Sequence, residues 1–468
     1  MSSRQTARSE NGRGWLALVL CYLAGLALGC LAWSLIRIPL GETHGIVSAA
    51  TRSGFNPLNN VVRTAACVLL PSALLALCCH LDLGRIGSYM RTSPIWDRNI
   101  PASRSPARTR LAGVFLVMTF AAIMAVNLWG TRPFSYDALH DGESLSAGLS
   151  WLQGQVPYRD YLFIHGVLQD PGRAALSFAL FGKSIGSLRA VDHLARAFIL
   201  LLVATFLWQI FRGRLAWVLL SLLALGALMA SAAIGSERLP FSPVVIQIRE
   251  LPTLLFLNVA ALIARRLEQQ RSGRWALAGL TFAYVLLPVL AYLVSVDRGL
   301  FLTAAMLLGI PLIFGGCAPG LKSLLTLLLA AGTGILLGAT TLILVLGNGW
   351  PAFWEYMTVY LPRYNALIVG LEYPIRAPAF FVAQAMLSAA AFVFTALLIR
   401  HFSARPEGLA EAWRCFCRRR FLEVTLLTMS AIWFAMAMTQ ADTWHLRQAT
   451  LPMYLGLFYL VVRYFLDP

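Results

Sequence analysis

Apolar runs of about 20 residues, bounded by short polar segments, recur from Trp15 to Phe465 and constrain this chain more than any other feature. Hydrocarbon offers no partners for backbone polar groups, so runs of this kind are expected to cross a bilayer as helices. The sequence therefore predicts an all-α, polytopic transmembrane bundle of about twelve spans. The expected spans are 15–36, 61–81, 111–130, 194–211, 215–234, 251–264, 275–295, 300–316, 323–346, 377–399, 421–438 and 449–466.

The composition agrees with a membrane domain. The chain is 58% hydrophobic and 13% charged, whereas soluble domains carry about 25% charged residues. The net charge is +17, but the basic residues lie between apolar runs and form no stripe with interleaved aromatics, so we expect contact with membrane lipids and no nucleic-acid partner. The eight cysteines fall in apolar spans or basic loops, which favours reduced structural thiols over a disulfide framework.

Lysine and arginine counts in alternate loops predict the orientation. The larger share lies in 1–14, 82–110, 212–214, 265–274, 317–322 and 400–420, which places both termini in the cytoplasm. The first run, Trp15–Ile36, has no cleavage motif after it and is expected to remain as an anchor. Three parts follow: N-terminal spans and a cytoplasmic loop in 1–130, an extracytoplasmic loop in 131–193, and the remaining spans in 194–468 with outer loops at 235–250, 347–376 and 439–448.

The 131–193 loop is unusually long for a compact protein, and such loops are usually functional or disordered. Its aromatic residues alternate with acids, which predicts ordered interfacial helices against the outer leaflet. The stretch Trp350–Tyr364 likewise indicates an amphipathic interfacial helix.

Three carboxylates and an imidazole come together in Phe134–Glu143. If the segment is helical, Asp137 and Asp141 share a face while Glu143 points elsewhere. A partly desolvated carboxylate at a membrane edge can act as a general base or bind a divalent cation. The alternative is a solvated loop or a helix cap.

Two further clusters carry polar groups at span edges. In Pro157–Gly166 and just beyond, an aromatic belt explains the Tyr and Phe residues but leaves Arg159, Asp160, His165 and Asp170 unexplained. In Gln440–Arg447, His445 and Arg447 lie next to hydrocarbon, where charge is costly and usually functional. The guanidinium of Arg447 suits a phosphate group, although an Asp442–Arg447 ion pair that anchors the loop is the alternative. Arg298, Arg363 and Arg376 have weaker claims.

These motifs resemble a known superfamily. Gly154–Gly166 (GQVPYRDYLFIHG), preceded by an acidic motif, and the late Asp442-Thr443-Trp444-His445 are similar to bacterial C-type membrane glycosyltransferases. That superfamily includes protein O-mannosyltransferase-like and lipid A aminoarabinose-transferase-like enzymes. The chain departs from the pattern in two ways: Gly142 separates Asp141 from Glu143 where many relatives have adjacent acids, and two spans precede the motif-bearing helix where many relatives have one.

The resemblance implies inverting transfer of a sugar from a polyprenyl-phosphate donor to a glycan, lipid or protein acceptor, on the extracytoplasmic face of a bacterial inner membrane. Asp141 would then be the base or a ligand of a divalent cation (Mg or Mn), with Glu143 beside it. The group expected to bind the donor and its phosphate comprises Arg159, Asp160, His165, Asp170, His445 and Arg447. A polysaccharide polymerase or ligase and a multi-span transporter are the alternatives, and the sugar and the acceptor stay open.

Overall fold

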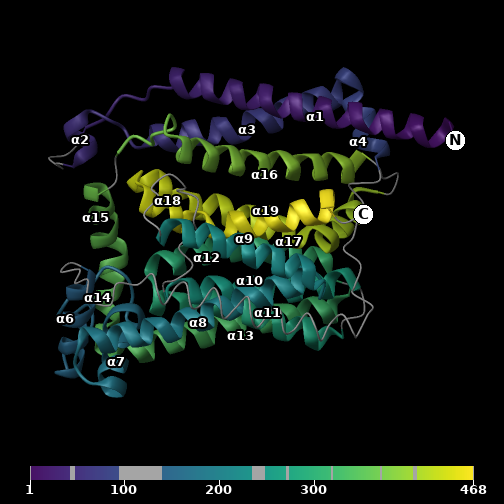
Figure 1. Ribbon diagram of the computed structural model, residues 1–468. Coiled ribbons are helices and arrows are strands. Elements are labelled where there is room, and N and C mark those ends of the chain that lie inside the picture. The colour runs from purple at the N-terminus through teal and green to yellow at the C-terminus, as the bar shows by residue number, and fades with distance from the viewer. Residues whose placement is uncertain are drawn as a thin grey trace.

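The computed structural model of the chain describes residues 2–42, 48–93, 140–233, 248–269, 273–317, 320–368, 371–403 and 408–466. Within these ranges the regular structure is helical, and the extended pairing is a single isolated bridge between Pro157 and Tyr161. The all-α prediction is confirmed. The long helices lie side by side as one bundle with roughly common axes (Figure 1).

The described helices have the following bounds. The helices of the bundle are α1 (Ser2–Leu35), α3 (Leu58–His80), α8 (Ile185–Ile210), α9 (Leu215–Ala233), α10 (Glu250–Gln269), α11 (Arg274–Val294), α12 (Val296–Gly316), α13 (Leu321–Leu346), α16 (Pro378–Ser403), α17 (Leu409–Gln440) and the shorter α19 (Leu451–Val461). The short ones are α2 (Ala49–Ser53), η1 (Leu83–Arg85), α4 (Ile86–Thr92), α6 (His140–Leu152), η3 (Leu168–Gly172), α7 (Arg173–Phe181), η4 (Gly347–Gly349), α14 (Trp350–Glu355), η5 (Tyr356–Tyr360), α15 (Leu361–Ile368), α18 (Thr443–Ala449) and η6 (Val462–Leu466).

Eight helical segments within the described ranges are long and apolar enough to cross a membrane, which makes the chain a multi-pass membrane protein. The predicted spans at 215–234 and 449–466 fall on shorter apolar helices. The span at 251–264 falls on α10, which carries charged residues at both ends. The span at 111–130 lies outside the described residues, so the count of about twelve stays a prediction. The eight segments are Gly14–Leu35, Leu58–His80, Ile185–Ile210, Trp275–Val294, Val296–Gly316, Leu321–Tyr364, Pro378–Ser403 and Leu409–Thr439.

The short helices gather at one end of the bundle, which we call the loop end. There α2, α6, α7, α14, α15 and α18 lie together, whereas α4 and both marked chain ends lie at the opposite, terminal end (Figure 1). Helices α14 and α15 run steeply across the bundle axis at the loop end. Trp350–Ile368 is helical, as predicted for its first fifteen residues. The described parts of 131–193, 347–376 and 439–448 thus share one end, as the assignment of all three to one side requires.

Glycine pairs spaced four residues apart let two helix pairs approach closely. On α1, a Cβ at Gly25 would lie 2.4 Å from the Pro71 backbone, and one at Gly29 would lie 2.8 Å from Cys67 of α3. On α13, a Cβ at Gly334 would lie 2.8 Å from the carbonyl oxygen of Phe282 in α11. Small residues at this spacing bring membrane helices together by backbone packing, because lipid supplies no hydrophobic driving force between helices.

A buried ionic network joins α10, α17, η6 and the turn after α8 near the terminal end. Glu423 of α17 accepts a hydrogen bond from Arg420 at 3.2 Å and forms an ion pair with Arg463 of η6 at 3.0 Å. Arg463 also lies 3.9 Å from Glu268 of α10, and Glu268 pairs with Arg212 beyond α8. Every charge in the network has an opposite charge beside it, as burial demands.

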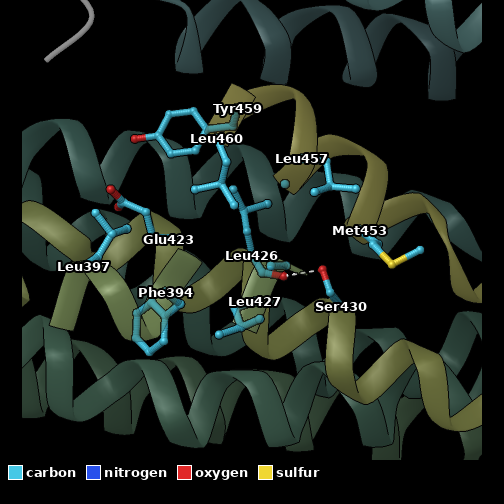
Figure 2. A pocket seen from close by; sticks show the side chains of 12 residues that line it. Phe394, Leu397, Glu423, Leu426, Leu427, Ser430, Met453, Leu457, Tyr459 and Leu460 are labelled. Carbon is cyan, nitrogen blue, oxygen red and sulfur yellow. Dashed lines mark hydrogen bonds between the residues drawn. The ribbon is translucent and has the colours of Figure 1, made fainter. Parts of the chain in front are cut away.

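The crevice beside this network is packed with side chains. It lies between α16, α17 and α19, and Figure 2 shows Phe394, Leu397, Leu426, Leu427 and Leu460 among its mostly apolar walls. Its free volume of about 10 Å³ is roughly that of one water molecule. The crevice is therefore part of the helix packing and has no room for a substrate.

The α11–α13 contact gives a first prediction. Gly334→Ala should destabilise the protein by about 1–3 kcal/mol, because the added methyl group would overpack against a backbone carbonyl. Gly332→Ala is the matched control on the same helix, since a Cβ there meets nothing within 4 Å. Thermal unfolding of the purified variants in detergent measures both. Equal midpoints for the two variants would contradict the close approach.

Candidate functional site

The structure describes only the last part of the predicted acidic motif, from His140 onward, where α6 begins. Asp137 lies outside the described residues, and the side chains of His140 and Asp141 are also outside them. Glu143 is half-buried in the first turn of α6. It lies close enough to Tyr356 and Tyr364, on the helices that cross the loop end, for its charge to act on their hydroxyl groups.

Arg159 and Asp160 form a paired turn at the exposed tip of the loop. The Arg159 guanidinium donates to both carboxylate oxygens of Asp160, at 2.8 and 2.9 Å, and the Val156 N–H donates to Asp160 at 2.7 Å. These hydrogen bonds, with that from Arg159 the largest cause, lower the pKa of Asp160 to about 2. A carboxylate this acidic is a poor proton acceptor, so the pair fits a role in shaping the turn.

The aromatic residues of the same turn anchor it to α14 and η5. Tyr158, with a φ of 66°, is buried and packs on Phe163, Phe353 and Tyr356, with ring centroids 4.6, 5.1 and 5.2 Å apart. Aromatic pairs at these separations add to the apolar area that they bury. This part of the loop is a packed turn between α6 and η3, whereas the sequence predicted interfacial helices.

His165 and Asp170 form a buried pair at the base of the loop. Asp170, whose side chain is 2% exposed, accepts from the backbone N–H of His165 at 3.3 Å and from its Nδ1 at 3.1 Å. A carboxylate at Nδ1 assigns the proton to that nitrogen and leaves Nε2 as an acceptor in the neutral ring. The His165 side chain keeps 21% exposure, so the imidazole is oriented and reachable.

A hydrogen-bonded chain holds Asp170 in turn. The Ser144 hydroxyl donates to Asp170 at 3.3 Å and accepts from Arg173 at 2.7 Å, and Arg173 forms an ion pair with Asp192 at 2.6 Å. These residues come from α6, η3, α7 and α8. The chain of contacts therefore fixes α6, which carries Asp141 and Glu143, against the segment that carries His165.

The loop is docked directly on the start of α12. The Val296 N–H donates to the His165 carbonyl at 3.4 Å, and the Tyr356 hydroxyl donates to the Ile164 carbonyl at 3.0 Å. A Cβ at Gly166 would lie 2.6 Å from the Val294 backbone, so the chain can pass here only as glycine. The site is thus built on the helix ends, which hold it more firmly than a free loop would.

Arg298 is the most buried cation of this region, with 0% of its side chain exposed. It forms a short ion pair with Glu250 at the start of α10, and its Nη1 donates to Asp297 at 2.9 Å. Its guanidinium also lies over the Trp433 ring of α17, 5.5 Å from the centroid. One side chain therefore links α10, α12 and α17 at the loop end.

The Tyr356 hydroxyl donates to the loop that carries His165, and carboxylates of three other elements lie within electrostatic range of it. Glu143 from α6, Asp170 from η3 and Asp297 from α12 all lie close enough to act on it electrostatically. His165 is close enough to interact with the charge of Asp297 as well. The Asp297 side chain is 35% exposed, so the cluster is open to the surroundings on that side. This cluster of Glu143, His165, Asp170, Asp297 and Tyr356 is the candidate site.

The late motif forms a second histidine–carboxylate pair, on α18. Asp442 caps the helix by accepting from the His445 backbone N–H at 2.8 Å, and it accepts from His445 Nδ1 at 2.7 Å. Among the described residues, Asp442 thus pairs with His445 and not with Arg447, the alternative that the sequence had left open. Arg447 is half-buried, and its Nε has no hydrogen-bond partner in the described part of the chain.

The described residues do not fit a divalent cation. Among them, no three His, Cys, Asp or Glu side chains come together in a way that could hold a metal ion. Asp141, one of the two predicted ligands, lies outside the described side chains, so the predicted metal role of Asp141 and Glu143 stays a prediction.

Sequence reasoning singled out His165, Asp170 and Glu143 but missed Asp297, Glu250 and Tyr356. One available signal was the dipeptide pair Arg249-Glu250 and Asp297-Arg298, each directly before an apolar run. Two opposite-charge dipeptides at span edges on the same side indicate charges that neutralise one another. Tyr356 has no comparable signal, because nothing in the spacing relates it to a loop nearly two hundred residues earlier.

The Arg298 contacts give a second prediction. Arg298→Met should lower the free energy of unfolding by about 3–5 kcal/mol, because it leaves the Glu250 carboxylate buried without its cation. The control is Arg414→Met, which removes a partly exposed pair with Glu411 that is worth at most about 1 kcal/mol. Thermal unfolding in detergent measures both. The combined Arg298→Met and Glu250→Leu variant should recover part of the loss, and recovery of none would argue against charge burial as the cause.

Comparisons with known proteins assign no function to the site. No protein-family model matches the chain, and no curated protein or solved structure matches it either. The resemblance to C-type glycosyltransferases accordingly stays an expectation from the two motifs.

Proposed function

We propose that this protein transfers a sugar from a polyprenyl-phosphate donor to a hydroxyl acceptor, with inversion at the anomeric carbon. The observation that carries the proposal is the His165–Asp170 pair, an oriented imidazole at the loop end of a membrane bundle with Asp297 within electrostatic range. Such a pair can take up a proton, and the membrane domain beneath it can hold the hydrocarbon tail of a lipid donor.

Two groups compete for the role of general base. The resemblance points to Asp141, whereas the geometry favours His165, because Asp170 directs the lone pair of Nε2 away from itself and would stabilise the imidazolium that forms. In the proposed step, Nε2 of His165 takes the proton from the hydroxyl of the molecule that receives the sugar. The oxygen of that hydroxyl then attacks the anomeric carbon of the donor. The bond from that carbon to the phosphate oxygen breaks, and its electron pair leaves with the lipid phosphate.

The leaving phosphate requires fixed donors, because negative charge concentrates on it as the bond breaks. Arg447 is the candidate that the geometry supports, since it is half-buried at the loop end and its Nε has no partner among the described residues. Arg159 has less support, because both of its described contacts go to Asp160.

The same proposal sets the orientation. The loop end faces the extracytoplasmic side of a bacterial inner membrane, both termini are cytoplasmic, and the chain crosses about twelve times. Both chain ends lie at the terminal end in Figure 1, which agrees with an even number of crossings.

Orientation gives the third prediction. A cysteine introduced at exposed Ser146 of α6 should react with an impermeant maleimide in intact cells, whereas one at exposed Lys322 should react only after permeabilisation. The unmodified chain is the background control, since its eight cysteines are buried or half-buried. The opposite labelling pattern would place the candidate site in the cytoplasm, where donors flipped to the outer face could not reach it.

The fourth prediction concerns the base. With purified protein and a panel of polyprenyl-phosphate sugars, His165→Gln should reduce turnover by about 10²–10⁴-fold while donor binding persists. Asp170→Asn should reduce turnover and shift its pH profile, because the imidazolium loses its carboxylate. His80→Gln, on an exposed histidine at the terminal end, is the matched control.

Asp141→Asn and Glu143→Gln separate the competing assignments. If Asp141→Asn abolishes turnover and His165→Gln does not, the base is Asp141. Release of polyprenyl diphosphate would favour a polymerase or ligase. If no donor in the panel is consumed, the transferase proposal fails. A transporter would then be the next hypothesis to test, because α10, α17 and η6 carry buried charges.

A further inference from the structure

A large cavity among the described residues is lined by none of the residues of the histidine–carboxylate site. Its volume is about 1340 Å³, and its walls come from the ends of α1 and α3, the segment after α2, and the chain leading into α16. Ligand sites in proteins usually span about 300–1,000 Å³, so this space can hold a large headgroup and part of a chain. The elements that form its walls meet at the loop end in Figure 1.

Three arginines line the cavity, against a single acid. Arg63 is buried and is held by Glu372 at 2.6 Å and by the Ile36 carbonyl at 3.0 Å. Arg37 and Arg376 are exposed to the cavity side and form no ion pair with any described residue. With Glu372 counted, the formal charge of these walls is about +2, so the cavity selects anions.

The rest of the lining is apolar and aromatic. Trp33 and Phe55 flank the Arg63 guanidinium at 5.9 and 6.0 Å, and Phe381 adds a third ring. The helices that form the walls expose Leu31 and Leu35 of α1 and Leu58 of α3 on their outer faces. These residues are suited to lipid, so a chain attached to an anionic head can leave the cavity along α1 and α3 without entering water.

We propose that this cavity binds a lipid whose headgroup is a phosphate monoester. A monoester carries about −1.5 to −2 at neutral pH, which matches the formal charge of the walls, whereas a phosphate diester carries only one negative charge. A sugar donor is a diester, and the lipid phosphate left after transfer is a monoester. The cavity is thus a holding site for the released carrier; that identification rests on the proposed function, while monoester binding rests on the cavity alone.

The titration of the monoester supplies a sharp test. Dodecyl phosphate is the probe, dodecyl methyl phosphate is the matched diester, and inorganic phosphate tests the head without a chain. Affinities are measured by calorimetry on the full chain in neutral detergent, at about pH 5 and about pH 8, on either side of the second phosphate pKa of about 6. Dodecyl phosphate should bind more tightly at the higher pH, the diester should show no such change, and inorganic phosphate should bind much more weakly than either.

Arginine variants locate the binding. Arg37→Gln and Arg376→Gln should each weaken dodecyl phosphate binding about tenfold or more, since each removes a charge-assisted hydrogen bond. Arg363→Gln, on an exposed arginine of α15 outside the cavity lining, should leave the affinity unchanged. Unchanged affinity in both cavity variants, or diester binding equal to monoester binding at both pH values, would overturn the proposal.

The two proposals can fail separately. If polyprenyl-phosphate sugars are consumed but the cavity variants bind dodecyl phosphate normally, the transferase stands and the holding site falls. If the cavity binds the monoester as described but no donor is consumed, the lipid site stands and the transferase falls.

Discussion

The buried Arg298 guanidinium imposes the strongest constraint on this structure. Removing a cation from water costs several kcal/mol, and the cost is met only if carboxylates with good geometry surround it. Glu250 and Asp297 supply them, so α10 and α12 must start at the same height, and α17 must place Trp433 over the guanidinium. The position of Asp297 follows from this arrangement. The neighbouring Val296 N–H donates a hydrogen bond to the carbonyl of His165 and so holds the loop in place. The candidate site therefore depends on an ion pair that takes no part in its chemistry.

The helices were predictable because lipid allows few alternatives to a helix for a long apolar run. The site was predictable where its parts are close in sequence: His165 and Asp170 are five residues apart, and Asp442 caps the helix that carries His445. Contacts between distant elements were not. Glu250 and Arg298 are separated by two helices, and the pairing of such helices depends on side-chain packing that periodicity does not encode.

The arginine cavity illustrates the same limit. Arg37, Arg63 and Arg376 each occur alone at the edge of an apolar run, with no motif around them. The sequence suggests only separate topology signals there. The three arginines line one cavity only because α1, α3 and α16 pack together. The glycines of α1 let that helix approach α3 closely.

The two ionic clusters on α10 fix both ends of this helix within the bundle. Glu268 lies eighteen residues after Glu250, which is about 27 Å along the helix. That length is close to the hydrocarbon thickness of a thin bilayer. Because both carboxylates are tied to arginines on neighbouring helices, α10 cannot slide or tilt alone to adapt to a thicker membrane. Lipid chain length should therefore influence the stability of the bundle around α10.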